Sequence, residues 1–505
     1  MTDAYQSWDF TKELNPQFLN YVCLLGGHAP PVLTGGFRYC QIGCGTGVSL
    51  SGIAAMYPNG EFIGIDNDPA CIDAAVALAA DADLDNVQFL HRELAKLAGA
   101  DLPAFDYIAL SDVYSLADPA IHGALLLIAG AHLAPGGVSF VNYHALPGFS
   151  ALANLRDLAR FHTVSLTHDD ATKAQAGLDY LAHLRDKKAG LFADNPALSA
   201  YLDDMMGTDI DRLAHDVFAA PVRALHFHQV ADEMDGIGLA YSGSATLNLN
   251  FIDIAVPPDF HDLLRKSATR TAFETHGDAI RNQTYRRDVF TKDAPELDEA
   301  ARDAKLAEIP FGTLCDADAF QRQVRFGEVD LSFDAEIFEL VIAAASDGAK
   351  TAAQMADMDG FGGYGPEIIT DAARFLSAGE QLLPFNAATS PAPAAALGAD
   401  KFALPVRFNF AILKQRLLKQ PTLGFVSTAA GAGFEISMMD ALFALCAAEA
   451  PAGQLSDHIF NRLFEARQQM IFEEGSETEA IKTALIEFRA HRLPKFLELG
   501  FLAPG

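Results

Sequence analysis

Short apolar runs alternate with helix-like stretches between residues 38 and 143. The apolar runs are RYCQI (38–42), EFIGI (61–65), NVQFLH (86–91), DYIAL (106–110) and GVSFVNY (137–143). The helix-like stretches between them include DPACIDAAVALAADA (68–82) and DPAIHGALLLIAGAHL (118–133). Apolar strands separated by helices are typical of a parallel sheet covered on both faces. The sequence therefore predicts an α/β fold built on a Rossmann-like sheet.

Three alternating glycines follow the first apolar run. Gly43, Gly45 and Gly47 mark a point where a strand ends, a helix begins, and a ligand can approach the bare backbone. A dinucleotide fingerprint would need glycine at Val48, and a phosphate-binding P-loop would need a lysine nearby. The spacing favours a ligand without phosphate at the loop, such as S-adenosylmethionine. The residues predicted to bind it here are Gln41, Gly43, Cys44, Gly45, Thr46 and Gly47.

The next two strand ends carry acids that suit a nucleoside. Asp66 and Asn67 follow the second strand, where a carboxylate can accept both ribose hydroxyls, in an NAD site or an adenosylmethionine site. Asp68 precedes Pro69 and is better described as a helix N-cap. After the third strand, Glu93 can accept from an adenine amino group while Leu94 offers its backbone amide; a plain surface glutamate is the alternative.

The fourth and fifth strand ends point to the reaction centre. Ser111 and Asp112 follow the fourth strand, and Asp112 can accept a proton or attract a cationic acceptor. Tyr114 and Tyr143 can orient an amine and stabilise the ammonium that forms. Half-buried structural packing is the alternative for each tyrosine. We predict Asp112, Tyr114 and Tyr143 as catalytic residues, with Ser111 at the donor.

The chain divides into several units by composition. Residues 1–150 and 220–256 are predicted to form the nucleotide-type domain, with a helix, a turn and a strand pair in 228–250. Residues 151–219 read as a helical insertion that forms a dimer contact or a substrate lid, or simply a helical unit. Residues 386–401 read as a linker, and 402–505 as a mostly helical C-terminal domain.

Residues 257–385 form the predicted middle domain. Helix signals at 333–346, 350–358 and 366–377, followed by a strand at 380–385, suggest a winged-helix-like unit. Residues 351–380 contain one basic residue, Arg374, and five acidic residues: Asp357, Asp359, Glu367, Asp371 and Glu380. Duplex DNA would be repelled by such a surface, so we expect a role in protein contact or packing.

The net charge of −30 argues against a nucleic-acid partner. A nucleic-acid partner needs a basic surface, whereas an acidic chain suits a basic partner. The six cysteines are scattered without a zinc-type spacing, so we expect no metal and reduced thiols. The N-terminus has no signal-peptide pattern and no apolar run is long enough to span a membrane, so we expect a cytoplasmic protein.

The motifs together resemble a known enzyme class. The glycine loop, the acid in FIGID, the glutamate in FLHREL, FDYIAL and LAPGGVSFV are similar to class I S-adenosylmethionine-dependent methyltransferases. A narrower resemblance, to bacterial methyltransferases with a methyltransferase regulatory domain, rests on ELNP (13–16), RYCQIGCGTG (38–47), FDYIALSDVYS (105–115), YHALPGF (143–149) and YSGSATL (241–247). That group includes protein-lysine methyltransferases that act on outer-membrane proteins. The resemblance implies S-adenosylmethionine as cofactor and a donor domain whose helical insertion can form a homodimer.

The chain departs from this group on both the donor side and the acceptor side. Members commonly read LELGCG, HGVYSW and YNALPGW, whereas here Gln41 replaces the acid and Ser111-Asp112 replaces His-Gly. Leu116, the His144-Ala145 pair, which is Asn-Ala in the motif, and Phe149 also differ. The narrower resemblance by itself implies methyl transfer to a protein lysine. A small-molecule O- or N-methyltransferase, a donor-binding protein without activity and, more remotely, an NAD-linked enzyme stay open.

Overall fold

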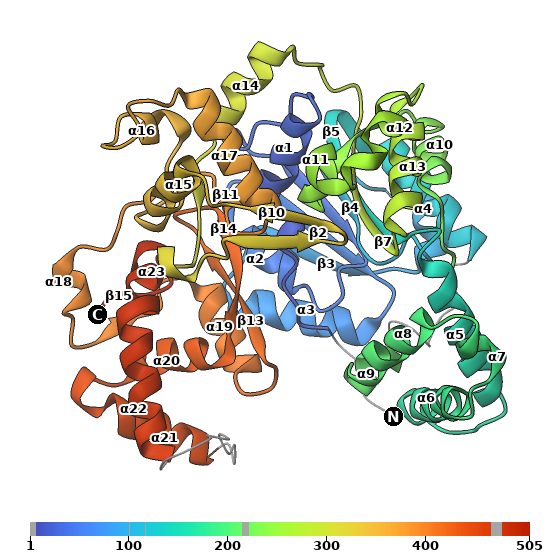
Figure 1. The fold of residues 1–505 in the computed structure, drawn as a ribbon. Helices are drawn as coiled ribbons and strands as arrows, with labels where there is room; N and C mark the ends of the chain where they lie inside the picture. Colours follow the sequence, from blue (N-terminus) through green and yellow to red (C-terminus); the bar gives the residue numbers. More distant parts are fainter. Residues whose placement is uncertain (1–6, 100, 117, 215–221, 466–476) are drawn as a thin grey trace.

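A seven-stranded sheet organises the N-terminal half of the chain (Figure 1). The computed structural model describes residues 7–99, 101–116, 118–214, 222–465 and 477–505. The strand order is β3-β2-β1-β4-β5-β7-β6, in which β1 to β5 run parallel. Strand β7 runs antiparallel to β5, and β6 pairs antiparallel with β7, so β6 has the direction of β1 to β5. The strands are β1 (Arg38–Ile42), β2 (Glu61–Asp66), β3 (Val87–His91), β4 (Phe105–Leu110), β5 (Leu133–His144), β6 (Ala240–Ser244) and β7 (Tyr285–Thr291). This architecture confirms the predicted Rossmann-like α/β fold.

Helices cover both faces of the sheet. Alternate residues of β1 enter different cores: Tyr39 packs with α1, α2 and α3, whereas Cys40 and Ile42 pack with α4 and α10. Helices α3 and α4 each begin with an aspartate cap followed by proline, and the caps Asp68 and Asp118 accept from the N–H two residues on. The helices around the sheet are α1 (Pro16–Leu25), α2 (Val48–Met56), α3 (Pro69–Asp81), α4 (Pro119–His132), α10 (Phe227–Asp235), α11 (Ile252–Ala255), α12 (His261–Arg265) and α13 (Arg270–Arg281).

The sheet extends beyond the domain boundary predicted at residue 256. Strand β7 lies between β5 and β6, yet it comes from residues that the sequence assigns to the middle domain. Of the strand pair expected in 228–250, β6 forms, and a 3-10 turn, η4 (Leu247–Asn250), follows it. The β7 sequence YRRDVFT carries three charges and so reads as surface. Arg286 and Asp288 are nevertheless 0% exposed, because they pair with each other inside the fold.

The helical insertion forms a lobe beside the sheet (Figure 1, green). It has a core of its own, which includes Leu155, Leu178, Leu181 and Leu202. Its helices are α5 (Phe149–Thr163), α6 (Asp170–Asp186), α7 (Gly190–Ala193), α8 (Ala197–Met206) and α9 (Ile210–Leu213). Residues 215–219 of the predicted insertion lie outside the described residues.

The middle region contains the three predicted helices together with strands that the sequence did not indicate. The three predicted helices are α15 (Glu336–Ser346), α16 (Ala352–Ala356) and α17 (Pro366–Ala378), and a further helix, α14 (Glu299–Ala307), precedes them. A hairpin of β9 (Gln323–Phe326) and β10 (Val329–Ser332) precedes α15. The strand expected at 380–385 shrinks to β11 (Leu383–Pro384), which pairs with β8 (Phe311–Gly312). The winged-helix likeness stays a prediction.

The predicted linker is packed against its neighbours. Thr389 donates its N–H to Ala349 (3.0 Å) and its hydroxyl to Glu498 (2.7 Å), and a short helix, α18 (Ala394–Leu397), follows. The C-terminal part is mostly helical but contains a buried hairpin. Its elements are β12 (Phe402–Ala403), α19 (Arg407–Arg416), β13 (Thr422–Ser427), β14 (Ala432–Ser437), α20 (Met438–Glu449), α21 (Leu455–Glu465), α22 (Glu477–Glu487), α23 (Leu493–Glu498) and β15 (Ala503–Pro504).

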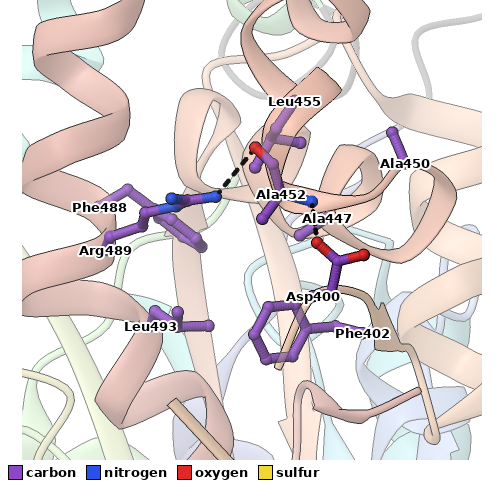
Figure 2. Close-up of a pocket in the computed structure, with 9 residues that line it drawn as sticks. All are labelled: Asp400, Phe402, Ala447, Ala450, Ala452, Leu455, Phe488, Arg489 and Leu493. Carbon is purple, nitrogen blue, oxygen red and sulfur yellow. Dashed lines mark hydrogen bonds between the residues drawn. The ribbon is translucent and has the colours of Figure 1, made fainter. Parts of the chain in front are cut away.

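A small cleft in this C-terminal part is lined by Phe402, Leu455, Phe488 and other mostly apolar side chains (Figure 2). Its interior of ≈ 10 Å³ holds about one water molecule. The cleft is therefore too small for a substrate. Across the described part of the chain, no helix is both long and apolar enough to cross a membrane.

Candidate active site

The glycine loop leaves one open face at the carboxyl edge of the sheet. The N–H groups of Gly43 and Cys44 donate to the carbonyl of Ile65 (2.8 and 3.2 Å), which fixes the loop against β2. The three glycines have φ values of 79°, 51° and 72°. A Cβ on Gly43 would lie 2.1 Å from the carbonyl oxygen of Ser111, and one on Gly47 would lie 2.7 Å from Phe89.

A Cβ on Gly45 would have no atom within 4 Å. Gly43 and Gly47 are thus required by close packing, whereas Gly45 faces free space. Among the three predicted glycines, Gly45 is the one against which a ligand can lie.

Asp66 stands at the tip of β2 beside this open face. Its carboxylate oxygens accept the N–H groups of Gly45 (2.8 Å) and Asp68 (3.0 Å), so the side chain is held in place. Each oxygen keeps a lone pair for a further donor, as two ribose hydroxyls would require. Asn67 is exposed, and its carbonyl contacts the ring of His91 (3.1 Å).

Gln41 lies in β1 just before the loop, and its buried side-chain oxygen lacks a hydrogen-bond partner in the part of the chain that the structure describes. It is 3% exposed, and within the described residues its Oε1 has no hydrogen-bond partner. A buried acceptor without a donor costs free energy unless a ligand or water satisfies it. An amine-bearing ligand at the loop fits this requirement.

A hollow lies at the end of β3, lined by His91, Arg92, Glu93, Lys96 and Leu97. Glu93 is exposed and pairs with Lys96 (2.7 Å). Leu94 is buried at the start of a 3-10 turn, η2 (Leu94–Gly99). The predicted adenine contacts therefore border a hollow, and Glu93 would exchange or share its lysine partner on binding.

Thr46 and Cys44 are directed into the protein. Thr46 is 2% exposed and donates its hydroxyl to the carbonyl of Ser7 (2.6 Å). Ser49, in the helix that follows, accepts from the N–H of Thr11 (2.9 Å). Burial raises the pKa of the Cys44 thiol well above its ordinary value. Thr46 and Ser49 thus hold the N-terminal segment on the loop. Because the side chains of Thr46 and Cys44 are buried, any contact of theirs with a ligand would be through the backbone.

Asp112 lies at the carboxyl edge next to the loop. Ser111 donates its N–H to Ile42 (2.9 Å), which joins the tips of β4 and β1. Asp112 is exposed and has a left-handed φ of 56°. Its N–H donates to Asn142 Oδ1 (2.6 Å), while its Oδ1 accepts from Asn142 Nδ2 (2.8 Å) and from the hydroxyl of Tyr285 (2.7 Å).

The sequence did not single out Asn142 or Tyr285. Asn142 lies in β5, two residues before its end, and Tyr285 opens the unpredicted β7. Beside them the ring of His144 stacks on Phe149, with centroids 4.0 Å apart, and meets the edge of Tyr285 at 5.6 Å. We refer to Asp112, Asn142, His144, Phe149 and Tyr285 as the rim.

Tyr114 lies inside the protein. It is 0% exposed and donates to Glu233 Oε2 (2.7 Å), which also contacts His122 (3.1 Å). Burial alone would raise the pKa of Glu233, but hydrogen bonds from His122 and Tyr114 outweigh it and lower the pKa to about 2. Tyr114 thus holds a half-buried carboxylate.

Tyr143 is also buried, at 1% exposure, and donates to Asp288 Oδ2 (2.8 Å). The structure brings neither this hydroxyl nor that of Tyr114 to the rim. The catalytic role expected for both tyrosines stays a prediction, and these contacts weigh against it.

Comparison with known proteins agrees with this geometry. Residues 33–185 match the family model of a methyltransferase domain. The chain is an S-adenosylmethionine-dependent methyltransferase. Residues 210–292 of this methyltransferase match a predicted methyltransferase regulatory domain, a range that includes β6, β7 and Tyr285.

The methyltransferase is similar to several proteins over nearly its whole length. An uncharacterized protein from Synechocystis sp. is 24% identical over 98% of this chain and 97% of the relative. The solved structure of PKMT2 from Rickettsia typhi in complex with AdoHcy has a TM-score of 0.75 at 18% identity, covering 98% of this chain and 99% of that chain. A second PKMT2 structure gives a TM-score of 0.77 at 18% identity, with coverage of 99% and 100%. The fold is thus shared from end to end.

Proposed function

We propose that this methyltransferase transfers a methyl group from S-adenosylmethionine to a protein acceptor, at lysine. The observation that carries the proposal is the rim, where an exposed carboxylate, Asp112, stands beside the open donor loop. The end-to-end fold likeness to PKMT2, whose structure contains AdoHcy, supports the same class of acceptor. The net charge of −30 suits a basic target.

The residues of the donor side fit such a cofactor. The open face at Gly45 would receive the methionine part, Gln41 Oε1 would accept from its amino group, and Asp66 would accept from the ribose hydroxyls. Glu93 and the backbone of Leu94 would meet the base. When bound, S-adenosylmethionine supplies a methyl group on a sulfonium, which is a good leaving group.

The residues of the acceptor side would position an amine. A lysine ammonium first loses a proton, which Asp112 can accept and pass to water because it is exposed at the rim. The neutral amine nitrogen then forms a bond to the methyl carbon as the sulfur–methyl bond breaks and its electron pair stays on sulfur. Holding the nitrogen in line with that bond is the main contribution of the protein.

Incubation with a tritium-labelled methyl donor and fractionated lysate of the source organism tests the proposal. We expect label in acid-precipitable protein, recovered as methyl-lysine after hydrolysis. Label in a low-mass product would instead support the small-molecule methyltransferase. Tight binding of S-adenosylhomocysteine without any turnover would support a donor-binding protein without activity.

We further propose a cytoplasmic homodimer that uses the helical insertion. Phe161 and Val164, at the end of α5, are 79% and 77% exposed, which suits a surface that a second copy covers. Light scattering of the full chain should give twice the monomer mass of 54.1 kDa, and a monomer mass would contradict the dimer.

A further inference from the structure

Asp112 occupies a backbone position that favours glycine. Its φ of 56° lies in the left-handed region that glycine adopts most readily. Aspartate and asparagine tolerate this left-handed region better than other non-glycine residues. The turn can therefore carry an aspartate, which places a carboxylate at the rim.

Two strands hold this carboxylate in one orientation. Asn142 binds both the N–H and Oδ1 of Asp112, and Tyr285 donates to the same Oδ1. In the described residues, Oδ2 has one weak contact, with the hydroxyl of Ser111 at 3.4 Å. One oxygen is thus committed to the protein and the other is available to a ligand.

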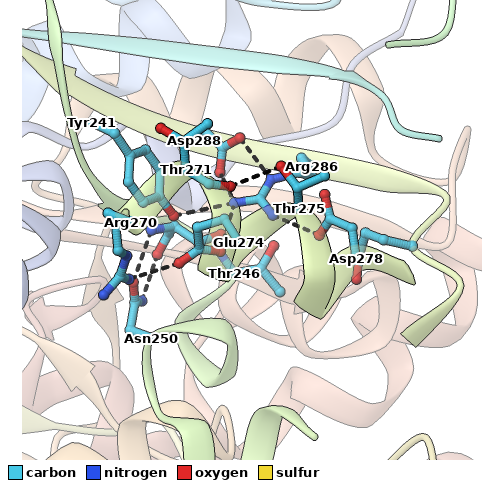
Figure 3. Close-up of polar contacts among 12 residues, drawn as sticks. Tyr241, Thr246, Asn250, Arg270, Thr271, Glu274, Thr275, Asp278, Arg286 and Asp288 are labelled. Carbon is cyan, nitrogen blue, oxygen red and sulfur yellow. Dashed lines mark hydrogen bonds and ion pairs between the residues drawn. The ribbon is translucent and has the colours of Figure 1, made fainter. Parts of the chain in front are cut away.

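A buried ionic cluster fixes the register that delivers Tyr285 to the rim (Figure 3). Arg286, the next residue in β7, is 0% exposed and binds Asp288 (2.8 Å), Asp278 (2.6 Å) and Glu274 (3.2 Å). Strands β5 and β7 pair Tyr143 with Arg286 and His144 with Tyr285. Because neighbouring residues of a strand point to opposite faces, a slip by one residue would move Tyr285 off the rim.

We propose that Asp112, oriented by Asn142 and Tyr285, is the site that selects a protonated primary amine as the methyl acceptor. The stacked rings of His144 and Phe149 provide an apolar wall for the alkyl stem of such an amine. Tyr285, which lies in the range matched by the regulatory-domain model, is accordingly part of the acceptor site. This inference rests on the proposed function.

Two substitutions test the site with little change of shape. Asp112→Asn keeps a residue suited to the left-handed turn and an oxygen for Asn142, but removes the charge. Tyr285→Phe removes the hydroxyl that orients Asp112. Tyr364→Phe is the matched control, because its hydroxyl also donates to a carboxylate, Glu336 (3.1 Å), in the middle region.

The probe is a fluorescein-labelled basic peptide with one lysine, against the same peptide with that lysine acetylated. We measure binding to the full-length protein saturated with S-adenosylhomocysteine, and methyl transfer from a tritium-labelled donor. We expect Asp112→Asn to weaken peptide binding and raise the KM about tenfold or more, as expected for loss of a charge-assisted contact. Tyr285→Phe should have a smaller effect in the same direction. Affinity for S-adenosylhomocysteine should be unchanged in both variants and in Tyr364→Phe.

The outcomes distinguish failure of the proposed methyl transfer from failure of the rim as the site that selects the acceptor. If the wild type labels neither the peptide nor any protein, the proposed function fails. If the wild type labels the lysine peptide but Asp112→Asn and Tyr285→Phe keep its KM and affinity, the rim is not the selecting site. Equal binding of the acetylated peptide would also overturn the inference.

Discussion

The two faces of the β5–β7 pair use similar residues for different purposes. On one face Tyr143 and Arg286 enter a closed cluster of carboxylates and are at most 1% exposed. On the other face Tyr285 reaches Asp112, whose carboxylate is open to solvent. A tyrosine–carboxylate contact is therefore no sign of function by itself. What distinguishes the rim is an acceptor oxygen left for a ligand.

Loss of the central guanidinium should have the largest effect. Arg286→Ala leaves Asp288, Asp278 and Glu274 buried without their shared cation. Breaking a buried ionic group of this kind costs about 3–5 kcal/mol. We expect a much lower melting temperature and poor soluble yield. Arg287→Ala, at the half-buried neighbouring position, is the control and should melt near the wild type. Equal melting of both variants would show that the cluster does not hold the sheet.

The donor side offers the next effect. Asp66→Ala should weaken binding of S-adenosylhomocysteine by about 1–3 kcal/mol, because donor groups lose their acceptor. Calorimetry with the full chain measures this loss. Asp68→Ala is the control: it removes the cap of α3, so it should lower the melting temperature while leaving donor affinity intact. Unchanged affinity in Asp66→Ala would show that the ribose assignment is wrong.

The parallel strands were predicted closely, whereas the rim was not. Strands β1 to β4 have apolar runs that a local pattern reveals, and observed and predicted bounds differ by a residue at most. The YRRDVFT strand is invisible to that pattern, because Arg286 and Asp288 neutralise each other inside the fold and also bind Asp278 and Tyr143. Tyr285 and Asp112 are 173 positions apart, and only the tertiary pairing of β5 with β7 joins them.

Tertiary contacts also decide the orientation of Tyr114 and Tyr143, which the sequence predicted to be catalytic. Sequence placed Tyr114 and Tyr143 at strand ends, where ligands bind in such sheets. The face that each side chain takes depends on partners such as Glu233 and Asp288, which lie 119 and 145 positions away. Gln41 was recognised as a departure from relatives, but its unsatisfied oxygen required the structure.

Acid should remove the contribution of the half-buried Glu233 to stability. The folded pKa of Glu233 is about 2, below the ordinary value of 4.5, so ionised Glu233 stabilises the fold above pH 4.5 and this contribution is lost as pH falls toward 2. Melting curves of wild type and Glu233→Gln should therefore differ most above pH 4.5 and converge near pH 2. A difference that is constant over this range would show that the charge of Glu233 has no part in stability.

The smallest effect concerns the loop. Gln41→Glu adds a charge facing the site of the donor amino group, and we expect donor affinity to rise by roughly 0.5–1 kcal/mol, as for a hydrogen bond that becomes charge-assisted. Calorimetry with S-adenosylhomocysteine is the measurement. Weaker binding would mean that burial of the new charge outweighs its contact, and that glutamine is fitted to this loop.

The most direct test compares Tyr143→Phe with Tyr285→Phe in one methyl-transfer assay. Each substitution removes one hydroxyl that donates to a carboxylate, at 2.8 Å and 2.7 Å. We predict that Tyr143→Phe lowers the melting temperature but leaves the KM for the lysine peptide unchanged. Tyr285→Phe should raise that KM and leave the melting temperature unchanged. The reverse pattern would contradict the assignment of the buried face to stability and of the rim to the acceptor.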